Sequence, residues 1–556
     1  MKRLLVALLA LLFVSAPALA KGGVASAADP RAAEAGRAML RAGGSAADAQ
    51  MAMLAALTVV EPQSSGIGGG GFFVYHEAKS GRSFTIDGRE TAPSAATPDR
   101  FLGKDGKPLP FLQAFPGGKS VGVPGNVRLM EVVHRKWGRL PWARLFDPAI
   151  TLAEDGYVVT PALASRIAGM GNMWNDFPAI KSLYWQDGRP KRAGDTVKNP
   201  ELAALLRAIA ARGPEAFYTG ENAARIVAAV AQSDRNPAVL TAADLAAYRA
   251  KERPSVCAKY RSYTLCGMGP PSSGATTVFQ ILGMLERFDM KKLGKDSPVA
   301  WHLIAEAMQL AYADRESYLG DADFVSVPVK GLLDRGYIAS RSKLLSETGA
   351  LARYTAGMPP GAGRRTAALS SEVAGTTNFV AADGAGNVAT MTSTVEGPFG
   401  SQLVVSGMVL NNELTDFTFA PEKDGAPVAN AVAAGKRPLS SMSPTIVYDA
   451  KGRVILALGS AGGKRIIMHV TKTLIGVLDF GLPAAQAIAL PNLYFGGGDV
   501  LVEQGTALAA MAPRIAALGQ QVVAADLSSK VNAVERTPAG WRGAADPRSE
   551  GVALNE

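Results

Sequence analysis

The strongest constraint on the fold is a change of pattern near residues 346–375. Upstream of this stretch, apolar residues mostly recur at the helical period, as in the long segment 298–319. Pro359-Pro360-Gly361 and Arg364-Arg365 then interrupt any periodicity. Downstream, strand patterns dominate, at 377–383, 388–394, 404–410, 444–449, 453–459 and 498–503. The sequence therefore predicts a helix-rich first part and a strand-rich second part, joined by a mobile connector.

Helices are expected on both sides of this connector. In the first part they fall at 30–42, 45–60, 126–136, 142–154, 162–169, 200–211, 220–232 and 242–248. In the second part they fall near 465–478 and 506–518. Residues 72–75 and 84–86 predict an early hairpin, and a strand or hairpin is expected near 256–266.

Charge and residue counts exclude several classes of function. The net charge is +10, but no Lys/Arg cluster of five to eight residues occurs, so we expect no nucleic-acid partner. Two Cys and four His cannot build a Cys-based zinc site or a disulfide scaffold, and we expect no metal and no cofactor. The four His are interpreted as structural. A length of 556 residues is enough for two or three ordinary domains.

The first twenty residues are interpreted as a signal peptide. Met1-Lys2-Arg3 is basic, residues 4–14 are apolar, and Ala18-Leu19-Ala20 fits the cleavage pattern. The run is too short for a transmembrane helix, and no later stretch reaches eighteen uninterrupted apolar residues. We expect a periplasmic or secreted protein without a membrane anchor after signal removal. In such a compartment Cys257 and Cys266 can form a disulfide, and two unpaired thiols are an equal alternative.

A glycine-rich run at 66–71 formally fits the dinucleotide pattern G-x-G-x-x-G. A dinucleotide site needs a strand before the run and a helix after it. Here the predicted helix comes first and the strand follows, and no Gly-Lys-Ser/Thr occurs, so we interpret the run as a tightly packed helix-to-strand connection.

A hairpin after the connector offers a nucleophile without histidine. If Asp383 pairs with Asn387 across the Gly384-Ala-Gly386 turn, then Thr376 faces Thr394 at the open end. The Thr376 hydroxyl can attack the carbonyl of Gly375 and convert the peptide bond to an ester that water cleaves. The new N-terminal Thr then carries both nucleophile and base, because its α-amine has a pKa near neutrality. Threonines that only favour strand structure are the plainer interpretation.

A series of motifs, in order along the chain, resembles the γ-glutamyltransferase (γ-glutamyltranspeptidase) family of N-terminal-nucleophile hydrolases. The motifs are Glu61-Pro-Gln-Ser-Ser-Gly-Ile-Gly-Gly-Gly-Gly71, Asp87-Gly-Arg-Glu-Thr-Ala-Pro93, Gly122-Val-Pro-Gly125, Pro270-Pro-Ser-Ser-Gly274, Ala305-Glu-Ala-Met-Gln-Leu-Ala-Tyr-Ala-Asp-Arg315, Gly375-Thr-Thr377, Asn411-Asn-Glu-Leu-Thr-Asp-Phe417, Lys436-Arg-Pro-Leu-Ser-Ser-Met-Ser-Pro444 and Gly459-Ser-Ala-Gly-Gly463. The resemblance covers nearly the whole mature chain. It implies an α+β fold, a four-layer αββα sandwich, cut by self-cleavage into a large subunit, 21–375, and a small catalytic subunit, 376–556, which remain together as a heterodimer.

The resemblance also assigns the reacting groups. Thr376 corresponds to the nucleophile and Thr394 to the hydroxyl that orients it, the same pair that the hairpin arithmetic gives. The N–H groups of Gly462 and Gly463 would form the oxyanion hole.

The same resemblance assigns the binding of the γ-glutamyl group. Arg89 would bind its α-carboxylate together with the hydroxyls of Ser440 and Ser441. Its α-ammonium would lie against three carboxylates, those of Glu396, Glu413 and Asp416.

The activity implied is that of a γ-glutamyltransferase and glutathione hydrolase. Thr376 would take the γ-glutamyl group from glutathione or another γ-glutamyl compound and pass it to water, an amino acid or a dipeptide. Ala461, Ala275 and Thr415 depart from common family residues, and Ala461 is expected to loosen the oxyanion loop. The segment 418–435 is short and lacks Tyr, so we expect a more open pocket.

Two other interpretations remain. A relative with the same fold could act as a glutaryl or cephalosporin acylase, or on poly-γ-glutamate. An exported binding protein with inactive threonines is the non-enzymatic alternative. Arg89 and the paired carboxylates favour a substrate with an α-amino acid end over a glutaryl group.

Overall fold

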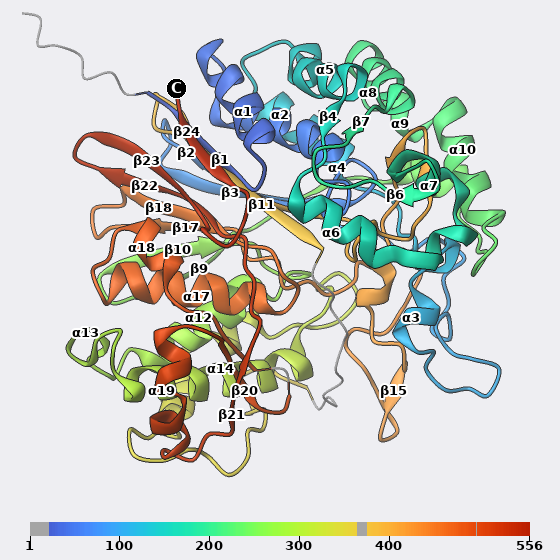
Figure 1. Ribbon diagram of the computed structural model, residues 1–556. Coiled ribbons are helices and arrows are strands. Elements are labelled where there is room, and N and C mark those ends of the chain that lie inside the picture. Colours follow the sequence, from blue (N-terminus) through green and yellow to red (C-terminus); the bar gives the residue numbers. More distant parts are fainter. Residues whose placement is uncertain (1–21, 364–374, 496) are drawn as a thin grey trace, which may run out of the picture.

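Two β-sheets form the centre of the molecule (Figure 1). The computed structural model describes residues 22–363, 375–495 and 497–556. The first sheet has the strand order β24 (Val552–Asn555), β1 (Val24–Ala27), β11 (Thr376–Ala382), β12 (Val388–Thr394), β2 (Gly70–Glu77), β3 (Arg82–Asp87) and β8 (Lys251–Arg253). The second has the order β23 (Gly540–Ala545), β22 (Asn532–Thr537), β18 (Val454–Gly459), β17 (Thr445–Tyr448), β10 (Tyr263–Gly267) and β9 (Val256–Tyr260).

The central strands β1, β11, β12 and β2 of the first sheet are buried on both faces. In β2, Phe73 and Tyr75 pack into one core and Phe72 and Val74 into the other, as the two-residue period of a strand requires. The core under Phe73 contains α1 (Pro30–Arg41), α2 (Ala46–Val60), α4 (Asn126–Trp137), α5 (Asp147–Asp155) and α8 (Pro200–Arg212). The core under Phe72 contains the second sheet together with α12 (Gly274–Leu285), α14 (Pro298–Tyr318) and α17 (Arg465–Leu478).

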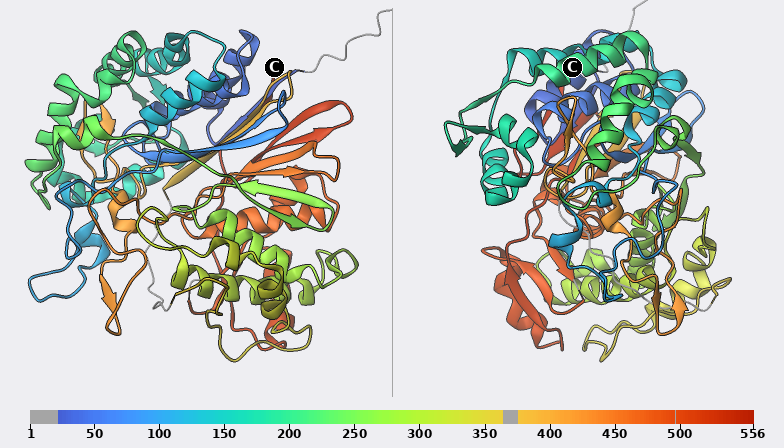
Figure 2. Two further views of the ribbon diagram at one scale, coloured as in Figure 1. Left: turned by 180° about the vertical axis from the view of Figure 1, so that it is seen from behind. Right: turned by 90° about the vertical axis from the view of Figure 1, so that its right-hand side faces the viewer.

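The resulting order of layers is helix, sheet, sheet, helix (Figure 2). Helix α2 is buried along its whole length, so it lacks the polar stripe of a surface helix. Ser45 begins it with a capping box to Asp48. The expected αββα sandwich is confirmed.

The remaining elements surround these layers. The remaining helices are α3 (Phe111–Ala114), α6 (Pro161–Met170), α7 (Pro178–Tyr184), α9 (Glu215–Tyr218), α10 (Gly220–Ala231), α11 (Ala242–Ala247), α13 (Met290–Leu293), α15 (Val329–Leu332), α16 (Arg335–Ser342), α18 (Ala484–Ala489) and α19 (Ala507–Ala516). The remaining strands are β4 (Tyr157–Val158), β5 (Trp185–Gln186), β6 (Arg189–Pro190), β7 (Thr196–Val197), β13 (Val404–Val405), β14 (Met408–Val409), β15 (Glu422–Lys423), β16 (Ala426–Pro427), β19 (Leu493–Phe495), β20 (Val500–Glu503) and β21 (Val522–Ala525).

The register of the central hairpin is the one predicted. Thr376 pairs with Thr394 and Ala382 with Val388, and the Asp383 N–H donates to the Asn387 carbonyl at 3.0 Å. The single strand expected at 404–410 is instead a small hairpin, because Ser406 and Gly407 have φ angles of 47° and 74° and turn the chain between β13 and β14. The strands β1, β22, β23 and β24 were not predicted.

Two further predictions concern the ends and the cysteines. Cys257 and Cys266 face each other on β9 and β10 and form a disulfide, so the alternative of two unpaired thiols is wrong.

Residues 346–363 of the expected connector contain no helix or strand. Residues 364–374 of the connector and the expected signal peptide lie outside the described residues. Among the helices of the described ranges, none has the length and apolar character to cross a membrane.

Candidate active site

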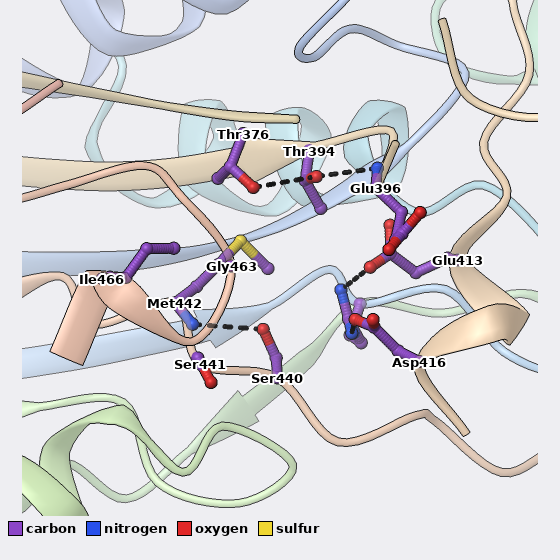
Figure 3. Close-up of a pocket in the computed structure, with 11 residues that line it drawn as sticks. Thr376, Thr394, Glu396, Glu413, Asp416, Ser440, Ser441, Met442, Gly463 and Ile466 are labelled. Carbon is purple, nitrogen blue, oxygen red and sulfur yellow. Dashed lines mark hydrogen bonds and ion pairs between the residues drawn. The ribbon is translucent and has the colours of Figure 1, made fainter. Parts of the chain in front are cut away.

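A chain of hydrogen bonds joins the two threonines to the peptide bond before Thr376. The Thr376 hydroxyl donates to Thr394 Oγ1 at 3.2 Å (Figure 3). The Thr394 hydroxyl donates to the Gly375 carbonyl oxygen at 2.9 Å. The Glu396 N–H donates to the same Thr394 oxygen at 2.8 Å. Glu396 has a φ of 76°, so the chain turns sharply after β12 and directs this N–H back at Thr394. Thr394 therefore contacts both the attacking oxygen and the carbonyl that it would attack.

Two glycines beside Thr376 present backbone N–H groups. Gly462 and Gly463 lie between β18 and α17 and have φ angles of 126° and 59°, values that favour glycine. In the part of the chain that the structure describes, neither N–H donates to another residue. They precede the first turn of the 14-residue helix α17, whose dipole favours negative charge at this end. The arrangement suits a developing oxyanion.

The carbonyl of Ala461, just before these glycines, is held by a buried histidine. His469 Nδ1 lies 3.1 Å from the Ala461 oxygen and 3.0 Å from Ser460 Oγ. Burial lowers the pKa of His469 well below its ordinary value, so the ring is neutral. None of the four His lines the pocket that contains Thr376 and Thr394.

Arg89 lines the same pocket as the two threonines and follows β3 after one intervening glycine. Its guanidinium is buried and donates to the Pro438 oxygen at 3.2 Å and to the Leu439 oxygen at 3.0 Å. It also forms ion pairs with Glu413 and with Asp416, the latter at 2.5 Å. The motif resemblance assigned Arg89 to the α-carboxylate of the substrate, and Glu413 and Asp416 to its α-ammonium. In the structure, which holds no substrate, Arg89 forms ion pairs with both of these acidic residues instead.

Buried carboxyl groups outnumber the guanidinium here. Besides Glu413 and Asp416, the cluster includes Glu90 and Glu396, which are 0% and 3% exposed. Burial raises the pKa of Glu90 to about 8, and burial also raises the pKa of Glu413 well above its ordinary value despite the nearby Arg89. Glu413 Oε2 has no hydrogen-bond partner among the described residues. The pocket is therefore short of positive charge and suits a ligand that carries an ammonium.

The two predicted serines lie beside this cluster, and one of them has a buried basic partner. Arg315 on α14 donates from Nη2 to Ser441 Oγ at 2.7 Å and from Nε to Ser273 Oγ at 2.9 Å. Ser440 Oγ accepts the Met442 N–H at 3.2 Å. Because Ser440 Oγ accepts this hydrogen bond, its own hydroxyl proton can be donated to a bound carboxylate.

Sequence reasoning assigned no role to Glu90 or Arg315. Both lie inside quoted motifs, yet nothing in their spacing indicates contact with the pocket. The sequence signal that could have identified Glu90 is its position directly after Arg89, and the structure shows that its side chain is fully buried.

The space around Thr376 is divided between two cavities. The pocket lined by Arg89, Thr394 and the acidic residues has a volume of only about 10 Å³, room for roughly one water. A second cavity, of about 450 Å³, is also lined in part by Thr376, together with Ala461 and Gly462. The Arg89 side is therefore almost filled by side chains in this structure, and the more open pocket expected from the absence of a lid stays a prediction. The short segment 418–435 forms the β15–β16 hairpin, which projects from the edge of the molecule (Figure 1).

The sequence profile described as Gamma-glutamyltranspeptidase matches residues 32–555. The chain is 37% identical over 547 residues to the glutathione hydrolase proenzyme of Escherichia coli, covering 96% of this chain and 91% of that protein. It is 35% identical over 547 residues to the Acylase ACY 1 proenzyme of Pseudomonas sp. strain SE83, covering 96% and 94%. The cephalosporin acylase from Bacillus halodurans superposes with a TM-score of 0.85 at 28% identity, covering 96% of each chain.

The sequence profile, the relatives and the solved structure point to the same family of proteins. The similarity extends over almost all described residues, including every motif quoted above. The chain belongs to the γ-glutamyltranspeptidase family and is an enzyme with the N-terminal-nucleophile hydrolase fold.

Proposed function

We propose that the chain is exported, cleaves itself between Gly375 and Thr376, and then acts as a γ-glutamyltransferase and glutathione hydrolase. Removal of residues 1–20 would leave fragments 21–375 and 376–556 in the periplasm or outside the cell. The observation that carries this proposal is the continuous hydrogen bonding from Thr376 Oγ1 through Thr394 Oγ1 to the Gly375 oxygen.

Self-cleavage follows from this arrangement in two steps. Thr376 Oγ attacks the Gly375 carbonyl carbon, the C–N bond breaks, and the nitrogen takes up a proton as the ester forms. Thr394 donates to the carbonyl oxygen as negative charge develops there. Water then hydrolyses the ester, leaving a carboxylate on Gly375 and a free amine and hydroxyl on Thr376.

Transfer of the γ-glutamyl group repeats the same chemistry on a substrate. The Thr376 α-amine takes the hydroxyl proton as Oγ attacks the γ-amide carbon. The N–H groups of Gly462 and Gly463 stabilise the oxyanion, and the departing amine receives the proton when the C–N bond breaks. Water or an incoming amine then takes the γ-glutamyl group from Thr376.

The Arg89 cluster provides binding for the amino acid end of the substrate. The α-carboxylate would replace a side-chain carboxylate at Arg89 and accept from Ser440 and Ser441. The α-ammonium would lie among Glu396, Glu413 and Asp416, whose surplus negative charge it neutralises. The present cavity of about 10 Å³ implies that the ion pairs of Arg89 separate when the substrate enters.

The acylase relatives make a glutaryl amide the alternative substrate. A glutaryl group has no ammonium, so it would leave the acidic residues without a counter-charge. The experiment is an assay of p-nitroaniline release from γ-glutamyl-p-nitroanilide and from glutaryl-p-nitroanilide, each with and without glycylglycine. We expect at least about a hundredfold higher kcat/KM for the γ-glutamyl compound, by analogy with unpaired buried charges. Equal or reversed rates would favour the acylase.

A further inference from the structure

The larger cavity beside Thr376 has a defined position relative to the reaction. Thr376, Ala461 and Gly462 are among its lining residues, and its volume is about 450 Å³. Thr376 also lines the small pocket that contains Arg89, and Gly463 lies on that side. A carbonyl group bound at Thr376 would therefore direct its glutamyl part into the small pocket and its amine part into the larger cavity. We call the larger cavity the amine-side cleft.

Positive charge predominates in this cleft. Its lining includes four basic residues, Arg166, Arg465, Lys530 and Arg548, and two acidic residues, Glu61 and Glu550. Lys530 pairs with Glu61 at 2.5 Å, and Arg548 pairs with Glu503 at 2.6 Å. Two of the basic residues are thus already neutralised by carboxylates.

The other two basic residues, Arg465 and Arg166, have no such carboxylate partner among the described residues. Arg465 begins α17, three residues after Gly462, and its guanidinium packs 5.7 Å from the centre of the Tyr494 ring. Arg166 lies exposed on α6. Within the described ranges, neither side chain has an ion pair or a hydrogen bond. They come from opposite sides of the Gly375–Thr376 bond, so the cleft is complete only when both fragments are present.

We propose that the amine-side cleft binds the departing amine and the incoming acceptor, and that Arg465 and Arg166 select amines that carry a carboxylate. This rests on the proposed transfer function. The departing amine leaves and the acceptor enters by the same path, because transfer to an amine is the reverse of acylation. A cavity of this size holds an amino acid or a short peptide. Guanidinium groups that have no carboxylate partner among the described residues bind a substrate carboxylate at low cost, since no existing ion pair has to break.

The test compares two acceptors that differ only in charge, with γ-glutamyl-p-nitroanilide as donor. Glycylglycine has a terminal carboxylate and glycylglycine amide does not. We expect wild-type kcat/KM for transfer to favour glycylglycine by about tenfold or more, the size of one hydrogen bond to a charged group. Arg465→Gln and Arg166→Gln should each lower this ratio, the double variant should bring it to about two or less, and Arg465→Lys should keep most of it.

The ratio is measured within each variant, so a general loss of activity cancels. Arg144→Gln is the matched control, because Arg144 is exposed and lies outside the cleft. If the Arg465→Gln variant does not fold or does not cleave itself, the ratio measured in Arg166→Gln, on the exposed face of α6, decides the test. A wild-type ratio near one, or an unchanged ratio in the Arg166 and Arg465 variants, would overturn the proposal. Failure of the proposed function is distinct: wild type would then release no p-nitroaniline even without an acceptor.

Discussion

At the scale of single residues, Thr394 has one hydroxyl proton and three contacts. It donates that proton to the Gly375 oxygen and accepts from Thr376 and from the Glu396 N–H. Thr394→Val keeps the shape of the side chain and removes all three hydrogen bonds. We expect self-cleavage to slow by roughly a hundredfold, as for loss of one oxyanion donor. The rate is read from the disappearance of the uncut chain on a denaturing gel.

Two variants make that test specific. Thr394→Ser retains the hydroxyl and should process within about tenfold of wild type. Thr390→Val removes a hydroxyl from the same strand away from Thr376 and serves as the control. Normal processing by Thr394→Val would show that the hydroxyl is not needed.

Glu90 gives a prediction for stability against pH. Its pKa is about 8 in the folded protein and its ordinary value is 4.5, with burial as the cause. The folded state therefore holds a proton that the unfolded state loses, so the free energy of unfolding falls as pH rises from 4.5 to 8. Glu90→Gln cannot titrate and should flatten this decline. Urea unfolding at about pH 5 and about pH 8.5 measures it, with exposed Glu201→Gln as control. An equally steep decline in Glu90→Gln would contradict the assignment.

At the scale of elements, the β9–β10 hairpin at the edge of the second sheet is joined by the Cys257–Cys266 disulfide. The double variant Cys257→Ser/Cys266→Ser should lose about 2–3 kcal/mol of unfolding free energy, because the closed loop is short. The hairpin is distant in sequence from the catalytic strands, so the rate of self-cleavage should stay unchanged. Urea unfolding of the processed protein measures the loss of unfolding free energy, and a denaturing gel measures the rate of self-cleavage. A loss of processing would mean that the hairpin is needed to build the site.

Elements with local signals were predictable, and those defined by distant partners were not. The range of α17 was predicted to the residue, because its apolar period and length are local. The Thr376–Thr394 pairing also follows from one short turn. In contrast, β1 and β24 have four residues each and pair with each other across the whole sequence. Nothing inside either segment indicates that partner.

Contacts between side chains of the site were likewise predictable only where a local signal exists. The nucleophile pair came from strand register, and the binding residues came from the motif resemblance. Arg315 on α14 reaches Ser441 only because the second helical layer packs against the loop before β17. That contact depends on the tertiary arrangement, so the linear sequence gives no spacing for it. The amine-side cleft was not predicted for the same reason, since it combines Arg166, Thr376 and Arg465.

At the scale of the whole molecule, the two predicted fragments share one sheet. Strand β1 of the first fragment lies between β11 and β24 of the second. Separation would expose strand edges and both cores. We expect the fragments 21–375 and 376–556 to elute together in size-exclusion chromatography without denaturant and apart in denaturant. Separate elution of folded fragments in buffer would contradict the shared sheet.

The central claim is that Thr376 becomes an N-terminal residue that carries the γ-glutamyl group. Intact mass spectrometry, with peptide mapping, of purified protein quenched in acid during turnover of γ-glutamyl-p-nitroanilide tests it most directly. We predict a small fragment that begins at Thr376 and ends at Glu556, part of it heavier by one γ-glutamyl group on the Thr376 side chain. Thr376→Ala should give only uncut, unlabelled chain. An active chain that is not cut before Thr376, or a γ-glutamyl group on another residue, would contradict the account.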